Sequence, residues 1–154
     1  MQSFHQFHDG FVDGVSTEGR IGGRVRIYLR TVDNDRFTAT IDGVVALNLS
    51  GFRAGNIIFD VAVFDYGEVT AKHVEELYDL PLESAARSKM RSMLLEKVEA
   101  EKLVVLSIDP SYGARCTALG RAVELVEEAP TLSPKAGEQD GAPPTAHPKL
   151  TTGH

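Results

Sequence analysis

Tryptophan is absent from the chain, and its 154 residues include a single cysteine, Cys116. One cysteine excludes an internal disulfide framework and any zinc site built on several thiolates. No apolar run approaches the roughly 20 residues that cross a bilayer. Residues 1–10 contain neither Lys nor Arg, nor the apolar segment of a secretory signal. We therefore expect a soluble protein of the cytoplasm with no membrane partner.

Positive charge is also scarce, because 16 Lys and Arg stand against 22 Asp and Glu and give a net charge of −6. A nucleic-acid binder needs a surplus of cations to neutralise phosphates, so the composition excludes a general one. The Gly-x-Ser-x-Gly motif of serine hydrolases is missing, and Cys116 has no histidine near it in the sequence. Gly19, Gly22 and Gly23 are not followed by the Lys-Ser/Thr of a phosphate-binding loop. The sequence therefore predicts no catalytic residue and no cofactor.

Composition changes sharply after residue 128. Residues 129–154 hold five of the seven prolines, and they contain no aromatic residue, Val or Ile. Such a segment cannot bury enough apolar area to offset about 1–2 kcal/mol of backbone ordering entropy per residue. We predict a single domain over residues 1–128 and a Pro-rich disordered tail over residues 129–154. The charges of the tail cancel, so the domain carries the whole charge of −6.

Alternation of apolar and polar residues predicts strands in the first half of the chain. Residues 24–30 alternate Val25, Ile27 and Leu29 with polar neighbours, and turn-forming residues follow. Residues 57–64 are apolar enough for a central strand covered on both faces. The remaining expected strands are residues 11–15, 37–41, 44–49, 103–108 and 121–126.

The second half changes to helical spacing. Residues 70–78 begin with a Thr cap, and residues 84–102 form a longer helix capped by Ser84. A stripe on the longer helix is expected to fill the core, and it consists of Ala86, Met90, Met93, Leu94 and Val98. Residues 111–119 fit either a short helix or a strand. The predicted class is α+β, an antiparallel meander of about five to seven strands with two main helices on one face.

His5, His8 and Asp9 are the nearest approach to a metal site, because imidazole and carboxylate groups suit zinc and similar ions. Zinc needs at least three protein ligands, and the next histidine, His73, is far away in the sequence. The alternative is that His8 and Asp9 hydrogen-bond the first strand at a turn that includes Gly10. We predict no bound metal and keep the three residues as candidates.

One predicted strand presents a basic and aromatic row on a single face, made of Arg24, Arg26, Tyr28 and Arg30. Such a row could bind an anionic ligand or an acidic partner. The alternative is that the arginines pair with acidic residues of neighbouring strands, such as Asp13 or Asp42.

The long predicted helix carries its charges in an order that opposes its macrodipole. Arg87, Lys89 and Arg91 lie in the N-terminal half, while glutamates dominate the C-terminal half. This order costs about 0.3–1 kcal/mol for each charge in a terminal turn. A surface tuned only for helix stability would avoid it, so we interpret the three basic residues as candidates for an interaction face.

Several short motifs resemble a group of small uncharacterised bacterial domains. The motifs are Phe7-His8-Asp9-Gly10, the strand at residues 25–31, the turn at residues 51–56 with Ile57-Ile58, and Pro110-Ser111-Tyr112-Gly113-Ala114. Some domains of similar size and patterning are immunity proteins of bacterial toxin systems. The resemblance implies a binding role rather than a reaction.

Two hypotheses follow. The first is a non-enzymatic interaction module, immunity-like or scaffolding, whose acidic domain suits a basic protein partner. The alternative is a small-ligand- or metal-dependent enzyme or regulatory domain that uses His8 and Asp9, or the face of Arg24, Arg26 and Arg30. A pocket containing His8 and Asp9 would favour the alternative, and a flat exposed apolar patch would favour the interaction module.

Overall fold

A computed structural model describes residues 1–19, 22–78 and 85–129 of the chain. These residues form nine strands, two α-helices and the short 3-10 helices η1 (His5–Phe7) and η2 (Tyr66–Glu68). The strands are β1 (Gln2–Ser3), β2 (Phe11–Glu18), β3 (Arg24–Arg30), β4 (Arg36–Asp42), β5 (Ala46–Ser50), β6 (Asn56–Phe64), β7 (Val104–Tyr112), β8 (Arg115–Gly120) and β9 (Ala122–Glu127). The helices are α1 (Ala71–Tyr78) and α2 (Ala85–Glu101). The α+β class is confirmed, with more strands than the sequence predicted.

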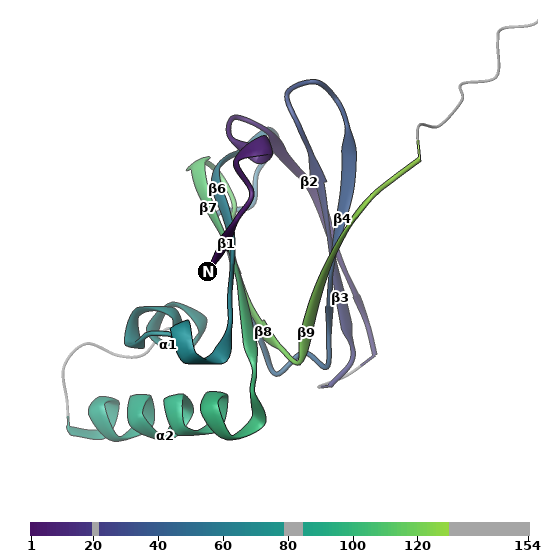
Figure 1. Ribbon diagram of the computed structural model, residues 1–154. Helices are drawn as coiled ribbons and strands as arrows, with labels where there is room; N and C mark the ends of the chain where they lie inside the picture. Colours follow the sequence, from purple (N-terminus) through teal and green to yellow (C-terminus); the bar gives the residue numbers. More distant parts are fainter. Residues whose placement is uncertain (20–21, 79–84, 130–154) are drawn as a thin grey trace, which may run out of the picture.

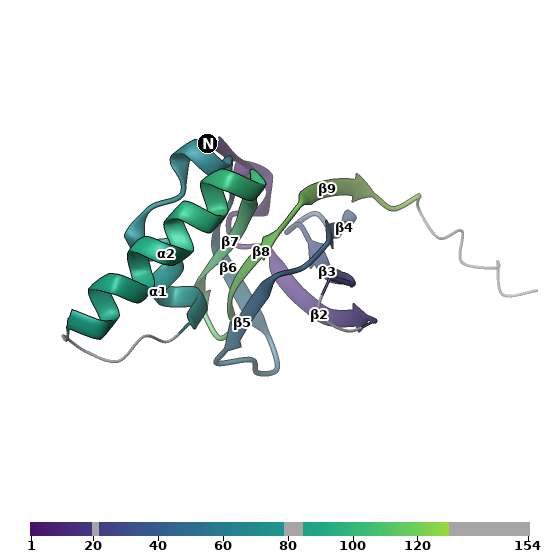
Figure 2. The ribbon, with the colours of Figure 1, turned by 90° about the horizontal axis from the view of Figure 1, so that it is seen from below.

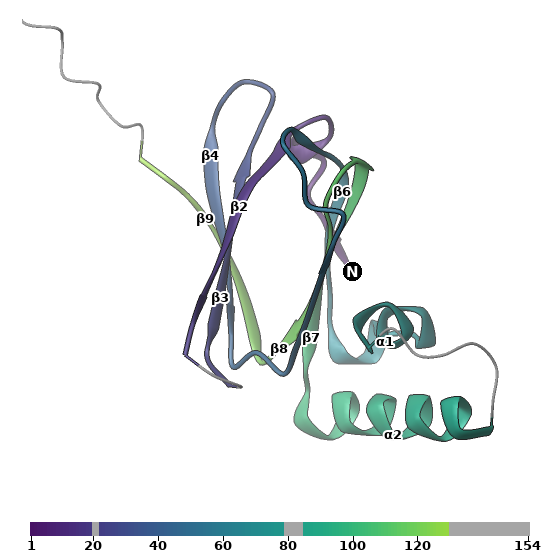
Figure 3. The ribbon, with the colours of Figure 1, turned by 180° about the vertical axis from the view of Figure 1, so that it is seen from behind.

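All the described strands belong to one antiparallel sheet in the order β5-β8-β7-β6-β2-β3-β4-β9, and β1 pairs with β6. The sheet bends so that β2, β3, β4 and β9 lie opposite β5, β6, β7 and β8 (Figures 1 and 3). Arg121 alone separates β8 from β9, so the chain crosses from one half to the other at that corner. The predicted meander describes β2–β4 and β6–β8, while β5 and β9 pair with strands distant in the sequence.

The main core lies between the two halves of the sheet. Ile27 and Leu29 of β3 meet Ile58 of β6 and Ile108 of β7 there, and each is at most 1% exposed. Cys116 belongs to the same core, where it packs as a small buried hydrophobe. Burial raises the pKa of Cys116 to about 12, so its thiol is a poor nucleophile in the folded protein.

Both helices cover the outer face of the half that contains β6, β7 and β8. Leu77 of α1 and Val98 of α2 pack with Leu103, Val105 and Leu119 in a second buried cluster. Figures 1 and 2 show the two helices side by side at one end of this half. The opposite end, which carries the β5–β6 and β7–β8 turns, is covered by neither α-helix.

The prediction that one stripe of α2 fills the core is wrong for three of its five residues. Met90 and Met93 are 49% and 59% exposed, and Ala86 is exposed as well. The buried face of α2 instead contains Val98, with Leu94 partly buried beside it. The helix has two apolar stripes, and helical spacing alone does not indicate which of them will face the protein.

The strand alternative for residues 111–119 is the correct one. β7 continues through Pro110 to Tyr112, and β8 begins at Arg115. Gly113 makes the turn between them with φ of 88°, a left-handed conformation that favours glycine. The predicted cap Ser84 and the predicted tail beyond Ala129 lie outside the described residues.

His73 lies in the first turn of α1 and makes stability depend on pH. The backbone N–H of Thr70 donates to His73 Nδ1 at 3.1 Å, and the imidazole packs on Phe64 with ring centroids 4.2 Å apart. Burial lowers the pKa of His73 from 6.5, because the charged imidazolium loses its solvation, and this outweighs the attraction of nearby Glu76 and Asp109. The unfolded chain therefore binds the proton more readily than the folded one.

We expect the free energy of unfolding to fall as the pH decreases below 6.5, and to level off once the folded-state pKa is passed. Gln in place of His73 keeps a hydrogen-bond acceptor but cannot titrate, so His73→Gln should flatten this slope. Urea unfolding at about pH 7.5 and about pH 5.5, on either side of the ordinary histidine pKa, measures it. The exposed His5 supplies the control variant His5→Gln, which should keep the slope. An unchanged slope in His73→Gln would contradict the assignment.

Candidate interaction surface

The arginines of the basic row on β3 form ion pairs with acidic residues of the neighbouring strands β2 and β4. The pairs are Arg24–Asp42, Arg26–Glu18 and Arg30–Asp13. The Arg30–Asp13 pair is two-pronged, because Nε and Nη2 donate to the two carboxylate oxygens at 2.9 and 3.0 Å. Tyr28 shares a hydrogen bond of 3.1 Å with the Ser16 hydroxyl. The observed contacts are thus the cross-strand pairs of the alternative interpretation, and they occupy the groups that an external anion would need.

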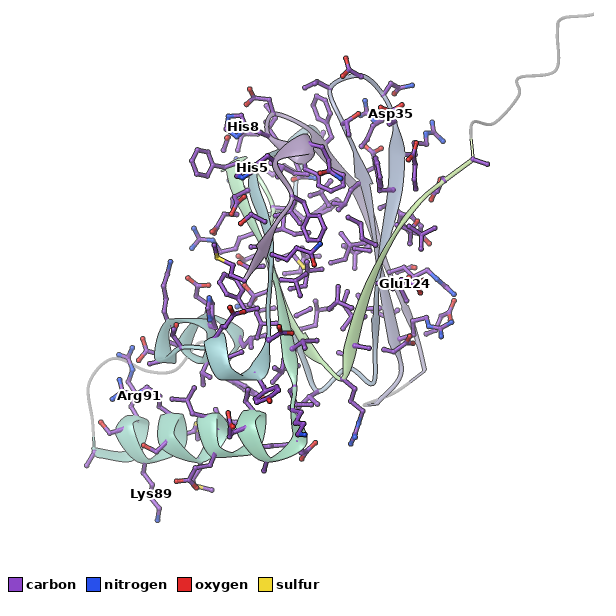
Figure 4. All side chains as sticks on the ribbon, viewed as in Figure 1. His5, His8, Asp35, Lys89, Arg91 and Glu124 are labelled. Carbon is purple, nitrogen blue, oxygen red and sulfur yellow. The ribbon has the colours of Figure 1, made fainter. Side chains whose placement is uncertain are left out.

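The three basic residues of α2 do not share one surface. Arg87 and Arg91 both reach Glu75 of α1, at 2.9 and 3.2 Å, and these contacts join the two helices. The hydrogen bond from Arg91 is the main reason that the pKa of Glu75 is lowered, and Arg87 adds to it. Figure 4 shows Arg91 directed toward α1, whereas Lys89 points away from the body of the protein. The charge order on α2 therefore has a tertiary explanation in Glu75.

His5 and His8 lie at the end of the sheet opposite the helices (Figure 4). His8 Nδ1 lies 2.8 Å from the carbonyl oxygen of Phe59 and must donate to it, and the Asp9 N–H donates to the carbonyl of Ile58 at 3.0 Å. This turn is therefore hydrogen-bonded to β6, and not to the strand expected at residues 11–15, which is β2. Among the described residues, no group of three His, Cys, Asp or Glu side chains could hold a metal ion.

Three aromatic side chains at this end are about half exposed: Phe52, Phe59 and Tyr112, with exposed fractions of 47%, 58% and 51%. We call these three residues the aromatic patch. Tyr112 of β7 is the cross-strand neighbour of Ile57, which in turn neighbours Phe11 of β2. Phe11 and Phe52 line a hollow of about 510 Å³, which is not lined by His8 or Asp9. The three residues of the patch therefore lie on β6, β7 and the β5–β6 turn, and Ile57 and Phe11 lie between Tyr112 and the hollow that Phe52 lines.

Irregular pairing between β6 and β7 turns Phe59 outward. The register shifts between Ile57 and Ile58 and again between Ile58 and Asp60, so Phe59 has no partner on β7. Ile58 and Val61 stay in the core on either side of it, while the Phe59 ring packs edge-on against His8 with centroids 5.4 Å apart. The bulge presents a large apolar side chain to solvent at an end that the helices leave open.

A buried asparagine holds the two turns that carry Phe52 and Tyr112. Asn56 is 3% exposed, and its Oδ1 accepts hydrogen bonds from the backbone N–H groups of Arg53 and Ala114 at 2.8 and 3.1 Å. Its Nδ2 donates to the carbonyl of Val12 at 3.3 Å. Sequence reasoning treated Asn56 as an ordinary turn residue, because nothing in the local pattern marks a buried amide.

Two carboxylates face each other beside the patch. Asp60 of β6 and Asp109 of β7 are cross-strand partners, an arrangement of like charges that is unfavourable by itself. Arg115 lies 3.3 Å from Asp109, whereas Asp60 makes no ion pair within the described part of the chain. The carboxylate of Asp60, which directly follows Phe59 in β6, is thus left uncompensated within the described residues.

No family model, curated protein or solved structure matches this chain. The resemblance to small bacterial domains therefore stays a hypothesis. In the part of the chain that the structure describes, no helix is long and apolar enough to span a membrane.

Proposed function

We propose that this protein is a non-enzymatic interaction module that binds a basic protein through the aromatic patch. The observation that carries the proposal is the half-exposed state of Phe52, Phe59 and Tyr112 at the end of the sheet that neither helix covers. Exposed apolar patches on a protein surface often mark sites of interaction with other proteins. Large aromatic side chains also supply much of the binding energy in protein interfaces.

Local charge supports a basic partner. Asp60 and Asp109 oppose each other next to Phe59, and an arginine or lysine placed between them would relieve their repulsion. The same cation would be attracted by the face of an adjacent aromatic ring. The net charge of −6 would speed the approach of such a partner. The alternative of an enzyme has less support, since His8 is bonded to the Phe59 carbonyl and the arginines of β3 are paired.

We expect Phe59→Ser to weaken partner binding by about 30-fold or more, the effect of removing a central aromatic anchor. Met93→Ser is the matched control, because Met93 is equally exposed but lies on α2. The partner is isolated by affinity capture from a lysate of the native cells, purified, and measured by binding kinetics at two salt concentrations. Its association rate should fall as salt rises, because the attraction is electrostatic.

Two results would contradict the proposal. One is a purified partner that binds wild type and Phe59→Ser equally well. The other is a partner with an acidic surface, whose association rate does not fall with salt.

A further inference from the structure

β9 is the last strand of the sheet and leaves one edge of its backbone open. On its other side it pairs with β4, and the Glu128 N–H donates to the carbonyl of Arg36 at 2.8 Å. Residues of an antiparallel strand alternate between facing the partner strand and facing away from it. Val123, Leu125 and Glu127 therefore direct their N–H and C=O groups to the open edge. Among the described residues, no backbone hydrogen bond reaches these groups from outside the β4 ladder.

A slot of about 450 Å³ lies along this edge, between β9 and the segment that contains β1. From other elements, its lining combines the apolar side chains of Phe4, Phe37 and Val63 with the polar side chains of Gln2 and Gln6. β9 adds Val123, Leu125 and Glu127. The same three residues of β9 thus offer backbone groups to a strand and a slot for its alternate side chains. This combination is what a sheet needs to bind an extended peptide as an added strand. Figure 2 shows β9 at the outer margin of its half of the sheet.

The charges at this edge select among possible occupants. Glu124, Glu127 and Glu128 give it three carboxylates, and none of them forms an ion pair within the described residues. Glu128 accepts a hydrogen bond from the Thr38 hydroxyl at 2.6 Å, and Glu124 lies near enough to Arg24 to attract it. A second copy of β9 would bring the same glutamates face to face, which is unfavourable. Residues 130–154 of this chain contain five prolines, which lack the N–H that a strand must donate. A strand with lysine or arginine meets neither obstacle.

We infer that the open edge of β9 is a second binding site, which takes an extended segment of a partner protein as an added strand. The segment has apolar residues that enter the slot, alternating with Lys or Arg that pair with Glu124 and Glu128. Glu127, at the slot, discriminates against acidic segments. This site is separate from the aromatic patch and does not depend on it.

The test uses the full-length chain and a fluorescent heptapeptide of alternating Lys and Val. We expect saturable binding by fluorescence anisotropy, with NMR shifts at the amides of Val123, Leu125 and Glu127. Glu127→Lys should weaken binding at least 10-fold, since Glu127 is exposed and its replacement spares the core. Met93→Lys is the matched control, because the Met93 side chain is exposed on α2, away from β9.

Two peptide variants complete the experiment. A peptide with proline at its central Val, or with Glu in place of Lys, should not bind. Phe59→Ser should bind the Lys-Val peptide like wild type, which separates this inference from the proposed function. Equal binding of the proline peptide, or unchanged affinity in Glu127→Lys, would overturn the inference. Slow hydrogen exchange at the Val123, Leu125 and Glu127 amides in the free chain would also overturn it, because the edge would then already be occupied.

Discussion

Phe7→Ala is expected to lower the free energy of unfolding by about 4 kcal/mol, the typical loss when a buried phenylalanine is truncated. The Phe7 side chain is fully buried, and its ring packs edge-on against Phe37 of β4 with centroids 5.1 Å apart. Phe7 belongs to η1, which lies against β6, so this one ring links the two halves of the sheet. Truncation removes apolar contact on both sides and leaves a cavity that the two halves cannot close independently.

A loss of this size is a large part of the stability of an ordinary domain, about 5–15 kcal/mol. Urea unfolding followed by circular dichroism measures the loss. Phe7→Leu is the matched control, because it keeps most of the volume and should cost about 1–2 kcal/mol. His8 follows Phe7 directly and contacts Phe59, so Phe7→Ala should also loosen the aromatic patch. If both variants cost less than about 1 kcal/mol, Phe7 does not hold the halves together.

Asn56→Ala is expected to cost about 3 kcal/mol, because it leaves several buried backbone groups without partners. The N–H groups of Arg53 and Ala114 lose their acceptor, and the carbonyl of Val12 loses a donor. The same change frees the two turns that carry Phe52 and Tyr112. Binding through the aromatic patch should therefore weaken at temperatures where the variant is still folded.

Thermal and urea unfolding measure the stability of this variant, and the kinetics of partner binding measure the second effect. Asn48→Ala is the control, since within the described residues Asn48 makes a single side-chain hydrogen bond, to the carbonyl of Glu76. This variant should lose about 1 kcal/mol. Equal losses in the two variants would show that the three contacts of Asn56 act no more strongly than one.

Local pattern was enough to locate several elements. The alternation around Ile27 predicted β3, and the Thr cap with its apolar spacing predicted α1 to within a residue. Both signals come from neighbours in the sequence, and both elements bury one regular face. The pairing of β5 with β8 and of β9 with β4 was not predicted, because cross-strand partners so distant in the sequence leave no local trace.

The candidate interaction surface depends even more on contacts between residues that are distant in the sequence. The sequence placed Arg87 and Arg91 on an interaction face, whereas in the structure both pair with Glu75 of α1. Phe59 looked like one residue of a covered strand, and it is exposed because a bulge turns it outward where neither α-helix lies. Helix placement and bulges are tertiary features, so an exposed aromatic patch is invisible to periodicity.

The late position of β9 in the chain also affects how the protein reaches this fold. Phe37 of β4 is paired with Glu127 of β9, and the contact closes a loop that contains most of the chain. Topologies rich in such distant contacts fold slowly, because the entropy of closing long loops is lost before the contacts form. While the chain is being synthesised, the outer edge of β4 stays unpaired until β9 has left the ribosome. The nascent chain is then at its most prone to aggregation, and a chain that stops before residue 122 should remain so.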